Sequence, residues 1–326
     1  MPQPKLFLER RPACVHQRSG WAYALDALAP LLRSGPPGVL LDSMIERTFA
    51  RELETSVREQ RIPYRRPWVG FVHVPGDIPD GHDASKSLLR LARLPAWQDS
   101  LPHCRGIVTL SHHHAAWVRS LFSQLPVLAL RHPTESAAPR FRFEEYLRHG
   151  QPVVQVGWWL RRLASIHHLP LPKARKFHLI PHSGADLDRY FSALAAESAR
   201  TGAPPLDQWD AHVLPRQSNE SYDALLARSV VFLHLHGAVA NNAIIESIVR
   251  HTPVLVNPLP SVREYLGEKY PLYFDTLDEA AAKAANPDLV LAAHHHLAQV
   301  DPGFLSGETF CREFAESALY QSLDCP

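Results

Sequence analysis

Short apolar runs alternate with stretches of helical periodicity along most of this chain, and that alternation limits the possible folds more than any other feature. Runs at residues 68–73, 106–110, 153–156 and 230–235 each have the length of a single strand. Strands that alternate with helices form parallel sheets, and strands covered on both faces are continuously apolar. The sequence therefore predicts an α/β fold of Rossmann type, with helices wrapped around parallel sheets.

The length of 326 residues predicts two domains, because an ordinary domain has about 150 residues. Residues 133–151 are rich in charged and turn-forming residues and contain the predicted boundary. We expect one Rossmann-like domain at residues 1–145 and a second at 146–300. Residues 301–326 carry Phe310, Phe314 and Ala318 at four-residue spacing, which predicts an amphipathic helix packed on a domain face.

The composition excludes several classes of protein. With 45% hydrophobic and 21% charged residues, the chain can bury cores and is not disordered. A formal charge of +1 and a pI near 7.9 argue against nucleic acid as a partner and allow at most peripheral membrane contact. Four scattered cysteines without C-x-x-C spacing, and apolar runs too short to cross a membrane, predict a cytoplasmic protein.

The most informative stretch is the loop at residues 236–242 and the helix that follows it. In a doubly wound sheet, loops at the carboxyl ends of strands line the ligand crevice. Either Asn241 or Asn242 can cap the helix, whose first amides suit a diphosphate. Glu246 lies one turn further on, where a carboxylate can accept hydrogen bonds from ribose hydroxyls. The alternative is that Glu246 only complements the helix dipole on a solvated face.

Residues 221–274 resemble the donor-binding segment of GT-B glycosyltransferases of the retaining, glycogen-synthase-like group. In that group a strand and a loop lead to a helix with a Glu-Ala/Ser…Gly-Thr-Pro-Val pattern, and a second loop ends in Glu-x-Leu. The matching positions here are Glu246, Ser247, Thr252, Pro253, Val254, Glu264 and Leu266. Residues 153–157 with the following Arg161 and Arg162 are similar to the first strand of the family's C-terminal domain.

The resemblance implies a GT-B-like fold, in which two Rossmann-like domains face each other across a cleft. It implies that Glu246 holds the donor ribose. It also implies that amides around Asn241 and Asn242 hold the diphosphate. By the same resemblance, Arg161 and Arg162 meet the donor phosphates.

Two further residues are expected at the donor site, and two positions depart from the family pattern. Gly157 directly follows the first C-terminal strand, and His236 lies where another strand ends. The family's earlier glutamate, eight residues before the second, is Ala238 here, and the glycine before Thr-Pro-Val is His251. Ala238 puts the usual positioning of the sugar in doubt and keeps open a catalytically silent module.

In the N-terminal half, His73 ends a strand before a loop that contains Asp77 and Asp83. His73 would orient the acceptor or the sugar or act as a base, and Asp77 would be an acceptor-side base. Equally, His73 could bond only to loop backbone, and the carboxylates could be solvated. Ser19 and Gly20 precede a helix and would admit a donor or acceptor close to the backbone, although glycine before a helix is also a routine turn.

The sequence predicts no metal site. Consecutive histidines at 112–114 and 294–296 would lie on helices, where neighbours point about 100° apart and do not converge on one ion. His234 and His236 share one face of a strand, but no third ligand is spaced to join them.

Together these residues predict a glycosyltransferase that moves a sugar from a nucleotide-diphosphate sugar to an acceptor, without a metal or another cofactor. Arg161 or Arg162 and the helix amides would stabilise the departing diphosphate. The acceptor class stays open between a glycan, a lipid-linked sugar, a small molecule and a protein. The alternatives are a sugar-nucleotide epimerase or hydrolase on the same fold, and a silent binding module.

Overall fold

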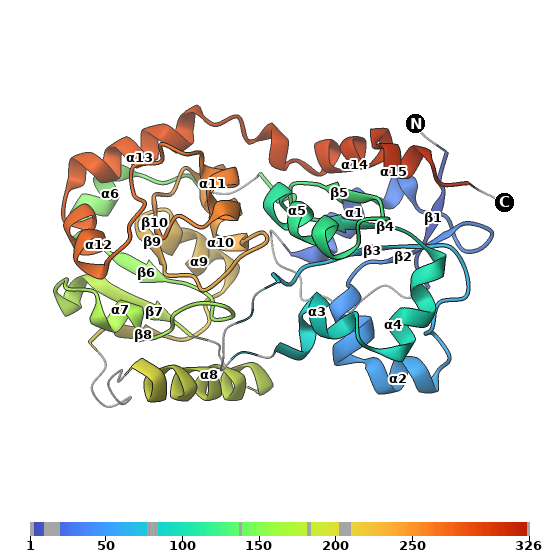
Figure 1. Cartoon of the computed structure of the whole chain (residues 1–326). Helices are drawn as coiled ribbons and strands as arrows, with labels where there is room; N and C mark the ends of the chain where they lie inside the picture. The colour runs from blue at the N-terminus through green and yellow to red at the C-terminus, as the bar shows by residue number, and fades with distance from the viewer. Residues whose placement is uncertain are drawn as a thin grey trace. The chain divides into compact units, whose positions relative to one another are not determined.

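The computed structural model describes residues 3–9, 20–76, 78, 82, 84–136, 139–180, 184–201 and 210–324. The chain packs as two compact units. The first comprises Met1–Ile78, Asp83–Glu135 and Gly303–Pro326, and the second comprises Pro79–His82 and Ser136–Pro302. Each unit is a parallel sheet with helices packed on it (Figure 1).

The first unit contains a five-stranded parallel sheet whose strands lie side by side in chain order. Its strands are β1 (Leu6–Phe7), β2 (Val39–Asp42), β3 (Trp68–Phe71), β4 (Cys104–Thr109) and β5 (Val127–Ala129). The helices are α1 (Trp21–Ala27), α2 (Leu53–Arg58), α3 (Leu88–Leu91), α4 (Pro95–Ser100), α5 (His112–Leu121), α14 (Gly307–Glu316) and α15 (Ala318–Gln321). A π-helical turn, η2 (Arg47–Arg51), directly precedes α2.

The two faces of this sheet pack against different helices, because alternate residues of a strand point to opposite faces. On one face, Trp68 of β3 packs with Trp97 of α4, with ring centroids 5.7 Å apart. On the other face, Phe71 contacts Trp21 of α1 and Phe314 of α14, at centroid distances of 4.9 and 5.9 Å. Both faces of the strand are therefore buried, as its continuously apolar sequence indicates.

The C-terminal segment belongs to the first unit. Tyr320 of α15 donates a hydrogen bond to the Gln3 carbonyl (2.8 Å), and its oxygen accepts one from the Lys5 amide (3.2 Å). Phe310 and Phe314 of α14 both contact Phe71. The amphipathic stretch thus covers one face of the first sheet.

The division between the units falls between residues 135 and 136, earlier than the sequence boundary at 145/146. The segment before α6 (Phe143–Arg148) explains the difference. Its Phe141 amide donates to the Arg250 carbonyl (2.8 Å), and its Arg142 amide donates to the Ala227 carbonyl (2.9 Å). These backbone bonds attach the segment to helices of the second unit.

The second unit has its own five-stranded parallel sheet, in the order β10-β9-β6-β7-β8. Its strands are β6 (Val153–Gln155), β7 (Lys176–Leu179), β8 (His212–Leu214), β9 (Val230–Leu233) and β10 (Val254–Val256). Its helices after α6 are α7 (Ser165–His168), α8 (Ala185–Thr201), α9 (Asn219–Leu226), α10 (Asn242–Arg250), α11 (Pro260–Leu266), α12 (Leu277–Ala284) and α13 (Pro287–Gln299). The chain runs outward from β6 to β8 and then returns to the other side of β6 with β9, so the strand order reverses between β6 and β9.

Within the described residues, no helix is both long and apolar enough to traverse a lipid bilayer.

Candidate functional site

The reversal of strand order between β6 and β9 marks the place where open α/β sheets bind ligands, beyond the carboxyl ends of the strands. The loops that leave these two strands are joined by backbone hydrogen bonds. The His236 amide donates to the Leu160 carbonyl (2.9 Å), and the Arg162 amide donates to the His234 carbonyl (2.8 Å). The sequence candidates after β6 and after β9 are therefore brought to one place.

Arg161 is held at this place by its neighbours. Its Nη1 donates to the Trp159 carbonyl (2.9 Å), and its Nη2 lies 3.5 Å from Oδ1 of Asn241. Gly157 has φ +73°, and a Cβ there would lie 2.7 Å from the guanidinium carbon of Arg161. A side chain at 157 would thus displace the arginine as well as strain the backbone.

The charge of Arg161 is available for an anion. Burial lowers the pKa of its guanidinium to about 10, which leaves the group cationic at neutral pH. No carboxylate of the described residues forms an ion pair with it, and its Nε is buried without a hydrogen-bond acceptor among those residues. A partly buried cation without a counter-ion favours an anionic ligand.

Helix α10 begins beside Arg161. Oδ1 of Asn241 accepts a hydrogen bond from the Ala243 amide (3.0 Å), so Asn241 is the N-cap and Asn242 is the exposed first residue of the helix. The first amides of a helix lack intrahelical acceptors and carry the positive end of its dipole. Asn241 therefore connects the guanidinium of Arg161 to the positive end of α10.

Glu246 does not lie on a solvated face. Its exposed fraction is 8%, and its carboxylate interacts with Tyr222 on α9, whose pKa is raised chiefly by burial and further by Glu246. Tyr222 also interacts electrostatically with Arg161. One turn further along α10, the buried Arg250 pairs with Asp223 of α9 at 2.6 Å and fixes how these two helices pack.

Tyr222 is a residue that sequence reasoning missed. It lies within the segment that carries the family resemblance, but its contact with Glu246 depends on how α9 packs against α10. A helix-start tyrosine has no local pattern that would single it out.

Arg162 and His236 border the same site. The Arg162 side chain is exposed, and it acts electrostatically on His234 and His236. Burial, aided by Arg162, lowers the pKa of His236 to about 4, so its imidazole is neutral at pH 7. Arg162 is thus the solvent-facing cation of the pair, and His236 adds no charge.

Glu246→Ala is expected to weaken binding of a nucleoside diphosphate by about 2 kcal/mol, roughly 30-fold, since hydrogen bonds to a charged group are strong. Calorimetry with the bare nucleotide measures this change. Glu144→Ala, an exposed glutamate on α6, is the matched control and should leave the affinity unchanged. Equal affinities for the Glu246 variant and the parent would remove Glu246 from the donor site.

The candidates of the first unit lie at the end of β3. His73 donates from Nε2 to the Ser43 carbonyl (3.0 Å), and its ring meets the edge of Trp21 at a centroid distance of 4.3 Å. Burial lowers the pKa of His73 to about 4. The imidazole is therefore neutral at pH 7, and with Nε2 donating, only Nδ1 can accept a proton or a hydrogen bond.

The other candidates of the first unit are less defined. Gly20 is buried at the start of α1 with φ −77°, a backbone conformation that any residue can adopt. Ser19, Asp77 and Asp83 lie outside the described residues.

Glu46 is a second residue that sequence reasoning missed. Its exposed fraction is 4%, and its Oε1 accepts hydrogen bonds from the amides of His73 (2.6 Å) and Val74 (2.7 Å). Burial, with a smaller contribution from Asp42, raises the pKa of Glu46 to about 7. A carboxyl group that titrates near neutrality beside a candidate site is typical of functional sites.

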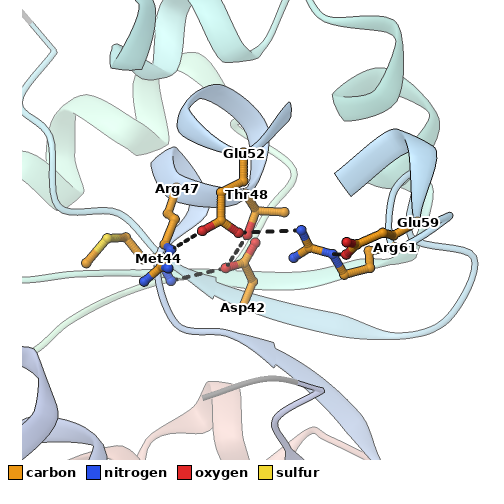
Figure 2. Close-up of polar contacts among 7 residues, drawn as sticks. All are labelled: Asp42, Met44, Arg47, Thr48, Glu52, Glu59 and Arg61. Carbon is orange, nitrogen blue, oxygen red and sulfur yellow. Dashed lines mark hydrogen bonds and ion pairs between the residues drawn. The ribbon is translucent and has the colours of Figure 1, made fainter. Parts of the chain in front are cut away.

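A polar network supports the turn that carries Glu46 (Figure 2). The buried carboxylate of Asp42 accepts hydrogen bonds from the Met44 amide (3.1 Å) and the Thr48 hydroxyl (3.2 Å), and Glu52 lies between Arg47 (2.6 Å) and Arg61 (3.4 Å). These groups line a cavity of about 60 Å³. The space holds a few water molecules rather than a sugar, so the network acts as structural support.

Three histidines of the two clusters hydrogen-bond to backbone or pack in the core. His294 bonds to the His251 carbonyl and His296 to the Leu266 carbonyl, both at 2.8 Å, while buried His114 stacks on Trp117. Among the described residues, no group of three or more histidine, cysteine, aspartate or glutamate side chains is arranged to hold a metal ion.

Comparison with known proteins gives matches only at the level of structure. No protein-family model and no curated protein sequence matches the chain. A crystal structure of S. aureus TarM with fondaparinux, alpha-GlcNAc-glycerol and UDP aligns with a TM-score of 0.58 at 11% identity, over 93% of this chain and 59% of TarM. The chain thus spans little more than half of TarM.

Two further solved structures align at slightly higher identity. The structure of "trehalose-6-phosphate from E. coli bound with UDP-2-fluoro glucose" has a TM-score of 0.56 at 15% identity, over 92% of this chain and 77% of that one. A UDP-forming α,α-trehalose-phosphate synthase from Burkholderia vietnamiensis has a TM-score of 0.51 at 16% identity, over 91% and 76%. The chain has the GT-B fold. The sequence prediction of an α/β chain with two Rossmann-like domains is confirmed.

Proposed function

We propose that this GT-B chain is a glycosyltransferase that uses a nucleotide-diphosphate sugar as its donor. The observation that carries the proposal is the position of Arg161, a cation without an ion-pair partner among the described residues. It lies beside the N-terminus of α10, where the strand order of the sheet reverses. The same helix carries the buried Glu246. Two of the similar solved structures contain UDP or a UDP sugar analogue, which supports a donor of this class.

In this mechanism the second unit binds the donor. Glu246 accepts hydrogen bonds from the ribose, while Arg161, Arg162 and the first amides of α10 bind the diphosphate. As the bond to the sugar breaks, negative charge grows on the diphosphate, and these preorganised cationic groups stabilise it. Retention of anomeric configuration is the outcome that the family resemblance implies.

The first unit supplies the acceptor side. His73 orients the acceptor or the sugar through Nδ1, or takes a proton there, and Asp77 is the further candidate base. Ser19 and Gly20 are the candidate positions at which the donor or the acceptor comes close to the backbone. The acceptor is a glycan, a lipid-linked sugar, a small molecule or a protein.

Release of free nucleoside diphosphate tests the proposal. The protein is incubated with UDP-, GDP-, dTDP- and ADP-linked sugars, and slow donor hydrolysis in the absence of an acceptor is expected with one of them. Binding without any release would favour the silent module, which Ala238 suggests. The backbone carbonyl of Ala238 accepts a hydrogen bond from the Ser261 hydroxyl (2.7 Å), a contact that does not depend on the side chain at this position. A C2-epimerised product would indicate an epimerase.

Donor binding is expected to survive EDTA. Arginines and helix amides provide the phosphate partners in this site, so no metal ion is needed to neutralise the diphosphate. The measurement is a titration with nucleoside diphosphate before and after chelation, with added Mg²⁺ or Mn²⁺ as the control. Binding that disappears in EDTA and returns with either metal would contradict this assignment.

A further inference from the structure

Three hydrogen bonds join the turn after β2 to the segment after β3. Oε1 of Glu46 accepts from the amides of His73 and Val74, and the Ser43 carbonyl accepts from Nε2 of His73. One short turn therefore fixes both the backbone and the imidazole of His73. Trp21 closes the other side of the ring.

The second oxygen of Glu46 is in a different situation. Oε2 is buried and has no hydrogen-bond partner among the residues that the structure describes. When the carboxyl group is ionised, part of its negative charge lies on this buried, unsolvated oxygen, and burial of that charge costs free energy. Burial of a neutral carboxylic acid or a carboxamide at the same position costs much less. The two amide hydrogen bonds favour the ionised carboxylate, whereas burial favours the neutral acid. Burial is the larger effect, because the pKa of Glu46 is raised to about 7.

We propose that neutral Glu46 is a positioning residue that holds the His73–Val74 backbone in place, and that its ionisation releases this segment and slows transfer. This inference rests on the proposed function only for its effect on transfer. The hydrogen bonds that Glu46 accepts from the two amides can be tested without any substrate.

Several other titratable groups lie around Glu46, and burial shifts the pKa of Asp42 and of three histidines. Asp42 of β2 acts on it and has a raised pKa, chiefly through burial. Burial lowers the pKa of His73 to about 4. It also lowers the pKa of His132, which interacts electrostatically with His73, to about 4, and the pKa of His114 on α5 to about 3. These three imidazoles are neutral above pH 6. Arg47, next to Glu46 on η2, is paired with Glu52.

Glu46→Gln is the central variant, because glutamine keeps the Oε1 acceptor and cannot ionise. Folding raises the pKa of Glu46 from 4.5 to about 7, so the native state holds this proton more tightly than the unfolded chain does. The resulting stability is present below pH 4.5 and lost as pH rises through about 7. The Tm of Glu46→Gln relative to the parent should therefore rise between pH 5 and pH 8.

Hydrogen exchange of the His73 and Val74 amides measures directly how strongly Glu46 protects them. In the parent, the protection factors of the His73 and Val74 amides are expected to fall about tenfold between pH 6 and pH 8, in step with ionisation of Glu46. In Glu46→Gln they should stay constant over that range. Glu54→Gln, an exposed glutamate on α2, is the matched control and should behave like the parent. Protection that does not change with pH in the parent would overturn the inference.

Transfer supplies the second readout. The ratio of Glu46→Gln to parent activity should be near one at pH 6 and at least threefold higher at pH 8, with equal affinity for nucleoside diphosphate. Glu46→Ala should slow transfer at both pH values. A parent and a glutamine variant with the same pH profile would contradict the positioning role. If the parent processes no sugar nucleotide at all, the proposed function fails, while the exchange experiment still decides the role of Glu46.

Discussion

Replacing Arg161 and Arg162 together by alanine is expected to weaken binding of a bare nucleoside diphosphate by more than 100-fold and also to slow turnover. Each arginine is assigned a charge-assisted contact with phosphate, worth about 1.5–3 kcal/mol, so the pair contributes about 3 kcal/mol or more. Turnover should fall in addition, because the same cations stabilise charge that grows on the leaving diphosphate. Calorimetry and release of nucleotide from the sugar nucleotide measure the two effects separately.

The single variants should differ. Arg161 is held by Trp159 and Asn241 and packs against Gly157, whereas the Arg162 side chain is exposed. Arg161→Ala should therefore cost more affinity than Arg162→Ala. Arg148→Ala removes an exposed arginine from α6 of the same unit and serves as the control. An unchanged affinity in the double variant would show that the diphosphate binds elsewhere.

His73→Ala is expected to lower transfer by about 100-fold or more while leaving affinity for the bare nucleotide nearly intact, the scale of one acid–base or positioning group. His73 lies in the first unit, and its neutral imidazole touches at most the sugar or the acceptor in this mechanism. A turnover assay beside a nucleotide titration separates the two quantities.

The control for this variant is His113→Ala, which removes an exposed histidine from α5 of the same unit. It should keep both activity and nucleotide affinity. If His73→Ala lost nucleotide affinity while the double arginine variant kept it, the roles of the two units would be reversed.

The parts of the fold that could be predicted from sequence are those set by local pattern. Continuously apolar runs predicted the core strands, and the two asparagines that end the loop at residues 236–242 predicted the start of α10. The choice of Asn241 over Asn242 as the cap could not be predicted, because it depends on which backbone amide each side chain reaches. The unit boundary was displaced for a similar reason, since hydrogen bonds to distant helices attach residues 141 and 142 to the second unit.

Half of the candidate site depends on contacts between segments far apart in sequence. The adjacency of β6 and β9, which brings Arg161 to Asn241, follows from sheet order rather than from any local signal. Glu46 and Tyr222 were missed because each acts through a residue on another element, His73 and Glu246 respectively. Glu246 was identified from its place on the helix and from family resemblance, but only its packing shows that it is buried.

The most direct test of the account is a calorimetric titration of the parent protein with UDP, GDP, dTDP and ADP, each without its sugar. The central claim is that the second unit binds the nucleoside diphosphate of the donor through Arg161, Arg162, Glu246 and the N-terminus of α10. It predicts saturable binding of one of the four nucleotides at a single site, with a Kd on the order of micromolar (about −8 kcal/mol). Absence of binding for all four at concentrations up to about 1 mM, where even a weak site of about −4 kcal/mol would be occupied, would contradict the claim.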